Sequence, residues 1–516
     1  MRYTFMDLDK PIEITIEVAT TWIRAKAERS GSIGGIDISR YFYHNLMEHE
    51  YIPRFNHWEI KARYALFDTN SSYVYMPRYS LDNLISALKM EIGRLGLTAH
   101  INTVNVSPVT PRHEEMAMKP SFAPRGHQPE MIEFLTDQSC GFKPLALMTG
   151  SGKTVCTIKA IVDMKYPALI VLSMLIDQWY KSILDFTTLT KDDIVVVKGY
   201  ASLVALWKML DGGYRPKIVL FSTRTLALYS LDYDGAYAQL PSYQKLQETI
   251  GFGVKVIDEC HLNFNTNSLI DYKSNIKMNI YLSATYQRSD SQGARIFNTY
   301  FPAEMKYGEQ FTKKYTSVYM LKYHLCIPQK DIRRFRVAKG YNHARYEDYL
   351  IKHSSYLKLF ANEVIRPAIL QFYCNVKKPG QHLLILAITK HFAIALKKQL
   401  DSELAKFGLS PGIFFSGSPD EFGKEENLKS DVIISTVKSC GTGRDIKQLK
   451  TCINTTSFSS EPQCIQMLGR LRELPGEQTI YVDMYNTEIP SHKMHARQRV
   501  QVYQARAKEY HSEFIR

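Results

Sequence analysis

Two short stretches of the chain have the residue types that bind and activate a nucleoside triphosphate. The first, TGSGKT, follows an apolar run and precedes a helical pattern. Its glycines let backbone N–H groups face a phosphate, and the start of the helix adds a positive dipole end. Lys153 is expected to reach the β- and γ-phosphates, and Thr154 to hold Mg²⁺. A full phosphate loop also has glycine six residues before the lysine, where this chain has Leu147. The residues expected to line the triphosphate are Thr149, Gly150, Ser151, Gly152, Lys153 and Thr154.

The second stretch, VKVIDECHL at residues 254–262, is an apolar run that ends in two adjacent carboxylates. Asp258 is expected to bind Mg²⁺ through water, and Glu259 to orient and deprotonate an attacking water. The alternative is a pair of solvated acids at a strand end, which is less credible so close to a phosphate loop. Together the two stretches predict Mg²⁺-dependent hydrolysis of ATP.

Strands and helices must alternate to position these residues. Continuous apolar runs between helical patterns are typical of parallel sheets that are buried on both faces. One set of runs lies at 144–148, 168–173, 217–222, 254–258 and 280–284, and another at 382–388, 412–417, 432–436, 452–458 and 479–485. The sequence therefore predicts two α/β domains in tandem.

The first 118 residues follow a different pattern, with alternation at 12–18 and a helical pattern at 81–95. Two prolines in SPVTPR, residues 107–112, indicate a boundary. We expect a small α+β DNA-binding domain (1–118), a first α/β domain (119–304), a basic linker (305–340), a second α/β domain (341–488) and a basic helical tail (489–516).

The composition of the 516-residue chain suits a globular protein with a polyanionic partner. Hydrophobic residues make up 45% of it, and no stretch of about 18 apolar residues predicts a membrane span. Acidic residues stand where a signal peptide would be apolar, and the eight cysteines lack CxxC spacing, so we expect reduced thiols in the cytoplasm. The net charge of +14 favours nucleic acid as the partner.

The positive charge is concentrated in two segments. Residues 305–375 have a net charge of +8 and residues 490–516 of +4, whereas residues 1–118 have −1. Basic and aromatic residues alternate in KDIRRFRVAKGYNHAR, residues 330–345. This block can be basic for solubility alone, but its density predicts phosphate contacts through Arg333, Arg334 and Arg336.

The order of motifs along the chain resembles that of the superfamily 2 helicases with a DECH box. After the phosphate loop and Asp258 to His261 come stretches similar to further motifs of that family, in the family's order, over residues 125–473. The resemblance implies two RecA-like domains with ATP between them. It assigns adenine recognition to Arg125 and Gln128, coupling of hydrolysis to movement to His261, Ser283, Ala284 and Thr285, nucleotide contacts to Gly443 and Asp445, and nucleic-acid contacts to Thr223, Arg224 and Thr436.

The motif nearest the end of the helicase-like region, QMLGRLRE at 466–473, resembles the one whose arginines act on ATP. The resemblance implies that Gln466, Arg470 and Arg472 reach the nucleotide, where an arginine fork stabilises charge on the transferring phosphoryl group. The family's second arginine stands seven residues after the glutamine, and this chain has Glu473 there. Either Arg472 takes that role or Arg470 acts alone.

Within this superfamily, residues 51–68 are similar to the small N-terminal domain of the UvsW-type phage helicases. The matching side chains expected to touch DNA are Arg54, Trp58, Lys61 and Arg63. The alternative is that Trp58 belongs to a core and the basic residues are merely on the surface. Tyrosines in the segment 227–250 can stack on bases or, more simply, pack beneath a surface loop.

The UvsW-type resemblance implies an ATP-dependent enzyme that migrates branches, regresses forks and unwinds R-loops in a bacterial host's cytoplasm. Its partners would be single-stranded, forked or branched DNA and RNA–DNA hybrids, with no membrane, and a monomer is favoured. Three alternatives remain open. They are a duplex DNA translocase, a viral origin-binding helicase, and a nucleic-acid-binding module with an inactive ATPase site.

Overall fold

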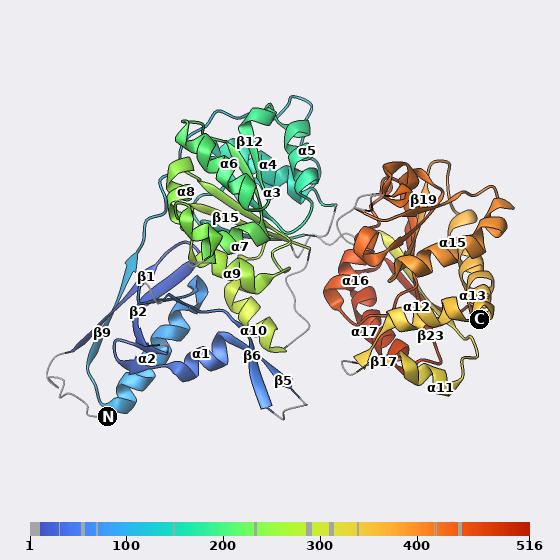
Figure 1. The fold of residues 1–516 in the computed structure, drawn as a ribbon, viewed down its shortest axis with the longest axis horizontal. Coiled ribbons are helices and arrows are strands. Elements are labelled where there is room, and N and C mark those ends of the chain that lie inside the picture. The colour runs from blue at the N-terminus through green and yellow to red at the C-terminus, as the bar shows by residue number, and fades with distance from the viewer. Residues whose placement is uncertain are drawn as a thin grey trace. The chain divides into compact units, whose positions relative to one another are not determined.

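The computed structural model describes most of the chain in two compact units. The described residues are 11–29, 31–52, 57–68, 71–147, 150–231, 235–284, 291–308, 314–337, 340–416, 418, 420–441 and 446–516. The first unit comprises Met1–Leu147 and Ser151–Phe311, and the second Met148–Gly150 and Thr312–Arg516. The division at Phe311 falls inside the segment 305–340 that we expected as a linker. Each unit is described by itself (Figure 1).

A six-stranded parallel sheet forms the centre of the first unit. Its strands are β10 (Phe142–Ala146), β15 (Met278–Ser283), β14 (Val254–Asp258), β11 (Ala168–Leu172), β13 (Ile218–Ser222) and β12 (Ile194–Val197), in this order across the sheet. Successive residues of β11 belong to different cores, because Leu169 packs on one face of the sheet and Ile170 on the other. Burial on both faces explains the continuous apolar runs in the sequence.

Helices connect the strands of this sheet and cover it. They are α3 (Gln128–Thr136), α4 (Lys153–Met164), α5 (Ile176–Phe186), α6 (Tyr200–Asp211), α7 (Thr223–Leu231), α8 (Tyr243–Ile250), α9 (Phe264–Tyr272) and α10 (Ser291–Tyr300). The five predicted strands are present. The edge strand β12 was not predicted, because it has only four residues and two of its side chains are not buried.

The N-terminal region forms a mixed sheet against which α2 packs. The sheet contains β1 (Ile12–Val18), β2 (Trp22–Arg29), β3 (Ser32–Ile33), β4 (Ile36–Asp37), β7 (Leu66–Asp68), β8 (Tyr73–Pro77) and β9 (Ala99–Asn105). The helices are α1 (Ser39–Asn45) and α2 (Leu81–Leu95), and α2 turns Leu84, Leu88 and Ile92 inward. The predicted strand at 12–18 and helix at 81–95 are therefore observed.

This N-terminal region shares a hydrophobic core with the parallel sheet of the first unit. Trp22, Tyr64 and Tyr75 belong to the same buried cluster as Phe142 and Tyr272. The indole N–H of Trp22 donates to the carbonyl of Ser274 at 2.7 Å, and the Tyr272 hydroxyl donates to the carbonyl of Tyr64 at 2.7 Å. Residues 11–118 are thus packed onto the following domain rather than tethered to it.

The second unit contains a seven-stranded parallel sheet. Across the sheet the strands are β20 (Pro411–Phe414), β21 (Val432–Thr436), β19 (His382–Ala387), β22 (Leu449–Asn454), β23 (Thr479–Asn486), β16 (Thr316–Tyr323) and β24 (Glu509–Phe514). The main helices are α11 (Gln329–Ile332), α12 (His343–Lys352), α13 (Ser354–Phe360), α14 (Arg366–Ile369), α15 (Lys390–Ala405), α16 (Glu461–Leu468) and α17 (Pro490–Arg506). With the first sheet, this confirms the predicted α/β fold class with two parallel-sheet domains of the RecA-like kind.

Two of these strands come from segments for which we expected other structures. β16 lies in the expected linker, and β24 lies in the expected helical tail, which is helical only over α17. β24 pairs with β16 from Glu509 to Phe514 at the edge of the sheet. Most of its side chains are exposed, so its sequence has no apolar pattern that could have predicted a strand.

Candidate functional site

The phosphate loop joins the end of β10 to the start of α4. Gly150 and Gly152 have φ of +90°, a backbone conformation that side chains other than glycine rarely adopt. Gly152 immediately precedes α4, so the first N–H groups of the helix lie at the loop. Lys153 is 8% exposed, and its ammonium group donates to the carbonyl of Leu147. Of the six residues expected to line the triphosphate, Gly150 to Thr154 are described at the start of α4, and Thr149 lies outside the described residues.

The expected adenine-recognition motif lies against this loop. A Cβ atom on Gly152 would stand 2.3 Å from Nε2 of Gln128, so only glycine fits beside that amide. Gln128 is the first residue of α3, and its Oε1 accepts a 2.9 Å hydrogen bond from the backbone N–H of Arg125. This arrangement holds the Gln128 side chain at the loop, while Arg125 is exposed.

Asp258 stands at the end of β14 and accepts two hydrogen bonds. The indole N–H of Trp179 in α5 donates to its Oδ2 at 2.7 Å, and the backbone N–H of Glu259 donates to its Oδ1 at 3.0 Å. Burial and the neighbouring Glu259 raise the pKa of Asp258 to about 6, while Trp179 and Lys153 oppose that rise. No pattern in the sequence predicts this contact between Trp179 and Asp258.

His261 connects the carboxylate pair to the next strand of the sheet. Its Nδ1 lies 2.8 Å from Oγ of Ser283 and 3.4 Å from a carboxylate oxygen of Glu259. Burial, followed by the charge of Lys153, lowers the pKa of His261 to about 4, so the ring is neutral at pH 7. Glu259, His261 and Ser283 are therefore adjacent. Ala284, which follows Ser283 in the sequence, is also buried. Thr285 lies outside the described residues.

Three loops at the carboxyl edge of the first parallel sheet are joined by hydroxyl and amide groups. Oγ of Ser173 lies 3.1 Å from Oγ1 of Thr223 and accepts a 3.4 Å hydrogen bond from Nδ2 of Asn263. Thr223 is 4% exposed, so its hydroxyl serves this internal contact, whereas the next residue, Arg224, is exposed. Thr223 and Arg224 were both expected to contact nucleic acid, and of these two only Arg224 presents its side chain to solvent.

Two side chains of the first unit are candidates to bind magnesium. The candidates are Asp258 and the hydroxyl of Thr154 in the first turn of α4. Among the described residues, no group of three or more His, Cys, Asp and Glu side chains is arranged to hold a metal ion. Proteins bind Mg²⁺ through one or two carboxylates together with substrate phosphates, and Asp258 is a carboxylate beside the expected phosphate loop.

The second unit carries the residues expected to act on ATP from the other domain. Gln466 lies on α16 and is 8% exposed, and Arg470 in the turn after α16 is 5% exposed. Arg472 is half-buried. Thr436 ends β21 and is buried, with its hydroxyl donating to Oγ of Ser439 at 2.9 Å. Gly443 and Asp445 lie outside the described residues.

The basic block of the second unit is held in place by its own side chains. Arg333, Arg334 and Arg336 are exposed, and Phe335 between them is buried in the core. The guanidinium group of Arg345 donates to the carbonyls of Arg334 and Arg336 at 3.3 and 3.1 Å. The three expected phosphate-binding arginines therefore point to solvent from a fixed backbone.

The hairpin of β5 (Met47–Ile52) and β6 (His57–Arg63) extends from the N-terminal region as a separate two-stranded sheet (Figure 1). Trp58 is 63% exposed and lies 5.4 Å, between ring centroids, from Tyr51 on the opposite strand. The alternative of a core tryptophan is therefore wrong. Lys61 is exposed but paired with Glu48, and Arg63 is exposed. Arg54 lies outside the described residues.

Most of the described tyrosines in the segment 227–250 pack against the protein. Tyr229 and Tyr243 are 6% and 4% exposed, and the Tyr229 hydroxyl accepts a hydrogen bond from the indole of Trp207 at 3.2 Å. The structure thus supports packing rather than base stacking for these two residues.

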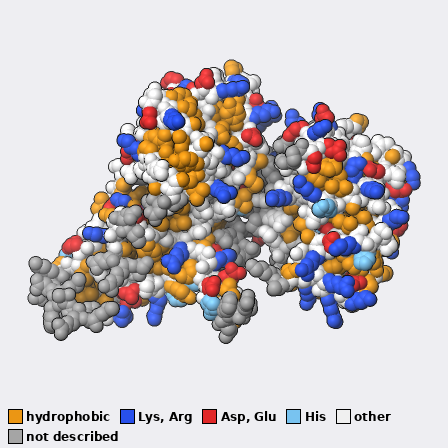
Figure 2. Space-filling view, in the orientation of Figure 1, with side chains coloured by type: hydrophobic (Ala, Val, Ile, Leu, Met, Phe, Trp, Pro, Cys, Tyr) orange, Lys and Arg blue, Asp and Glu red, His pale blue; other side chains and the backbone are white. Residues whose placement is uncertain are grey.

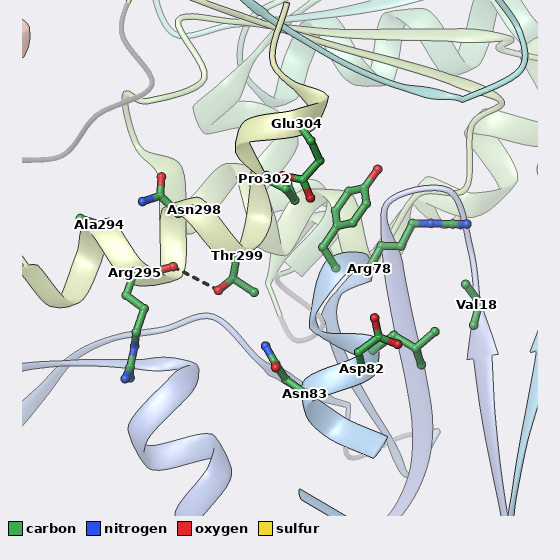
Figure 3. Close-up of a pocket in the computed structure, with 12 residues that line it drawn as sticks. Val18, Arg78, Asp82, Asn83, Ala294, Arg295, Asn298, Thr299, Pro302 and Glu304 are labelled. Carbon is green, nitrogen blue, oxygen red and sulfur yellow. Dashed lines mark hydrogen bonds between the residues drawn. The ribbon is translucent and has the colours of Figure 1, made fainter. Parts of the chain in front are cut away.

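A cavity of about 790 Å³ lies where α10 faces the start of α2 (Figure 3). Its lining mixes charges of both signs, including Arg78, Asp82, Arg295 and Glu304. In Figure 3, Arg78 and Asp82 belong to the N-terminal region, Arg295 to α10, and Glu304 to the turn that follows α10. This balance of charge does not favour a polyanion, so we assign the cavity to the contact between the two regions.

Comparisons with known proteins agree with this architecture. Residues 121–288 match the family model described as type III restriction enzyme, res subunit. No curated protein matches the sequence. None of the described helices is long and apolar enough to cross a membrane.

Two solved structures align with much of this chain. The ATP-dependent type ISP restriction-modification enzyme LlaBIII bound to DNA aligns over 83% of this chain with a TM-score of 0.50 and 12% identity, and the chain spans 36% of that enzyme's length. T4 UvsW aligns over 98% of this chain and 99% of its own, with a TM-score of 0.35 and 15% identity. With the phosphate-loop residues and Asp258, the family match marks residues 121–288 as an ATPase domain similar to that of these enzymes.

Proposed function

We propose that this ATPase moves along nucleic acid and remodels branched DNA, by branch migration, fork regression and R-loop unwinding during phage replication and recombination. The observation that carries the proposal is the exposed aromatic hairpin β5–β6 on a region that shares its core with the ATPase sheet. An exposed tryptophan next to a tyrosine offers faces on which bases stack. A rigid attachment would keep those faces at a fixed place relative to the phosphate loop.

For the ATP site, the proposed roles follow the geometry of the first unit. Lys153 binds the β- and γ-phosphates, Thr154 and Asp258 hold Mg²⁺, and Glu259 activates water. Arg125 and Gln128 contact adenine, and His261 with Ser283, Ala284 and Thr285 relays the state of the site. When bound, Mg²⁺ neutralises phosphate charge.

The second unit would supply the remaining groups of the ATP site and of the nucleic-acid path. Gln466, Arg470 and Arg472 would act on the nucleotide with Gly443 and Asp445. Nucleic-acid contacts would come from Arg54, Trp58, Lys61, Arg63 and Arg224, from Arg333, Arg334 and Arg336, and, with their hydroxyls already engaged, from Thr223 and Thr436.

A duplex translocase is the second candidate. The match of residues 121–288 to a restriction-enzyme subunit supports it, because the similar fold of LlaBIII belongs to an ATP-dependent restriction-modification enzyme bound to DNA. Such an enzyme would be stimulated by blunt duplex without preferring junctions.

The test is ATP hydrolysis by the purified chain with matched single strands, blunt duplex, a four-way junction and an R-loop. Strong stimulation by the junction and the R-loop, followed by their unwinding, is the expected result. Stimulation by blunt duplex alone would favour the translocase, and stimulation by none of these would overturn both.

A matched pair of variants on α4 tests the phosphate loop itself. Lys153→Ala is expected to abolish hydrolysis while DNA binding persists, because the exposed basic side chains lie elsewhere. Lys159→Ala, which removes a lysine paired with Asp163 on the same helix, should hydrolyse ATP at the wild-type rate. Retained hydrolysis in Lys153→Ala would remove Lys153 from the site.

A further inference from the structure

A groove in the second unit is lined in part by the basic block of residues 330–345. It has a volume of about 740 Å³ and lies between the hairpin β17 (Arg336–Val337) and β18 (Gly340–Tyr341), the segment 457–460, and the first turns of α17. Its lining residues include one arginine, one histidine, four serines, and three large aromatic or apolar side chains, with no Asp or Glu. Hydroxyl, guanidinium and imidazole groups make this lining rich in hydrogen-bond donors.

Arg336 is the cation that lines the groove, on a backbone held by Arg345, and Arg333, three residues earlier in the chain, is exposed. Figure 2 shows Lys and Arg side chains gathered on the end of this unit that carries α11 and β17 in Figure 1. An arginine in a lining that has no acid among its described residues is complementary to a polyanion.

The floor of the groove is rigid. The Tyr341 hydroxyl lies 2.5 Å from Nε2 of His492 and 3.1 Å from Nδ1 of His343. Both histidines are buried, and burial lowers the pKa of His343 to about 3 and that of His492 well below its ordinary value. The pair is neutral at pH 7 and holds the Tyr341 ring in place. On the opposite wall, Met494 is 53% exposed.

We propose that this groove binds one or two nucleotides of a single strand of nucleic acid. Phosphates would bind Arg336 and the serine hydroxyls, and a base would lie against Tyr341 and Met494. The volume is in the range that encloses a small ligand, and a base can lie flat against these side chains only when it is outside a duplex stack. The proposal rests on the proposed function, which makes nucleic acid the substrate, and it adds a single-strand site on the second unit.

The test measures binding of a labelled single-stranded oligonucleotide to the full chain as a function of salt. Arg336→Ala is expected to weaken binding about tenfold and to reduce the slope of log K against log salt by roughly 0.7, the value for one phosphate contact. Ser459→Trp fills the groove without removing a charge, and should also weaken binding. Lys358→Ala, which removes an exposed lysine outside the groove, is the control and should bind like the wild type.

Photo-cross-linking with 5-iodouracil in the oligonucleotide provides a readout that does not depend on a variant. Cross-links are expected at Tyr341 or Met494 and should disappear in Ser459→Trp. If the wild type binds the strand but both groove variants bind it equally well, or the cross-links lie elsewhere, the groove site is wrong while the proposed function stands. If the wild type binds no nucleic acid at all, the proposed function fails as well.

Discussion

At the scale of single residues, the most consequential contact is the hydrogen bond from Trp179 to Asp258. An indole N–H cannot lose its proton in the physiological range, so it always favours the ionised carboxylate. Burial of Asp258 works in the opposite direction and raises its pKa to about 6. The tryptophan therefore favours the charged form of Asp258, the carboxylate proposed to bind Mg²⁺.

Trp179→Phe should shift the pH dependence of ATP hydrolysis. Asp258 must be ionised, so kcat/KM for MgATP should fall as the pH drops through about 6. Without the indole N–H, the pKa of Asp258 should rise further. A hydrogen bond to a charged group is worth about 1.5–3 kcal/mol, so the acidic side of the profile of kcat/KM against pH should move upward by about one pH unit. The measurement is kcat/KM from pH 5 to 9, where the two profiles should converge at the alkaline end.

Trp207→Phe is the matched control for this experiment. Trp207 is also a buried tryptophan whose N–H is bonded, but its partner is the hydroxyl of Tyr229 in another part of the first unit. Its acid limb should stay at the wild-type position. An unshifted limb in Trp179→Phe would show that the contact with Asp258 has no bearing on ionisation.

The sequence predicted which residues meet in the first unit better than how they are held. Lys153, Asp258 and His261 lie together because the parallel strands β10 and β14, with β15 between them, bring their carboxyl ends to one edge of the sheet. The partner role of Trp179 depends on how α5 packs on β14, and no local pattern encodes that. The burial of Thr223 was missed for the same reason.

At the scale of elements, the hairpin β5–β6 is the part whose exposure demands an explanation. It forms no strand pairs with the main N-terminal sheet, and Tyr51, Trp58 and Ile60 are all more than 40% exposed. Large apolar side chains in such a position are typical of a binding surface.

Trp58→Ala should weaken DNA binding and leave stability unchanged. Loss of one base stack costs roughly 1–3 kcal/mol, or about 5- to 150-fold in affinity. Since the side chain is 63% exposed, the melting temperature should stay at the wild-type value. Fluorescence anisotropy with a forked DNA measures the affinity, and differential scanning calorimetry measures the melting temperature. Met90→Ala, at an apolar residue 67% exposed on α2, should change neither, and equal affinity for Trp58→Ala would exclude the hairpin from the interface.

Ending the chain at Ala507 should destabilise the second unit. β24 pairs in parallel with one edge of β16 and so covers that edge. Removal of β24 exposes the backbone groups of Ser317–Lys322 in β16, and it should lower the melting temperature of the second unit. Phe514→Ala, at a residue 62% exposed, keeps the strand and should melt normally. A truncated chain of full stability would mean that the strand adds nothing.

Strand prediction succeeded for continuous apolar runs such as β11, and it failed for β12 and β24, which have exposed side chains, and for β16, whose buried run TSVYMLKY contains polar residues. β11, β14 and β21 read as apolar runs, whereas β24 and β12 lie at sheet edges and carry exposed side chains. Edge strands owe their conformation to pairing with a neighbour, and the neighbour is far away in the sequence.

At the scale of the whole molecule, the N-terminal region is part of the first unit rather than a separate module. Trp22, Tyr64 and Tyr75 complete a core whose other members come from the ATPase sheet. Lys273 and Asp68 add an ion pair at 2.8 Å across the same contact. The two prolines at 107–112 predicted a domain boundary, but residues on both sides of that segment pack into one hydrophobic core.

Removing residues 1–118 should therefore destabilise the ATPase domain as well. The deletion would expose the aromatic surface of Tyr272 and its neighbours, and we expect poor solubility and loss of a cooperative transition. Calorimetry of the full chain should show this region melting together with the first parallel sheet. A separate transition for residues 1–118, or a truncated chain that melts like the wild type, would contradict a shared core.

The pairing of β16 with β24 also sets an order of events during protein synthesis. The first unit has all its strands once residue 283 has emerged from the ribosome, but the sheet of the second unit lacks a member until residue 514 follows. At about 5–20 residues per second, the nascent second half would wait roughly 10–40 s with the edge of β16 unpaired. A chaperone that binds extended apolar segments would find its longest-lived target on the nascent chain there.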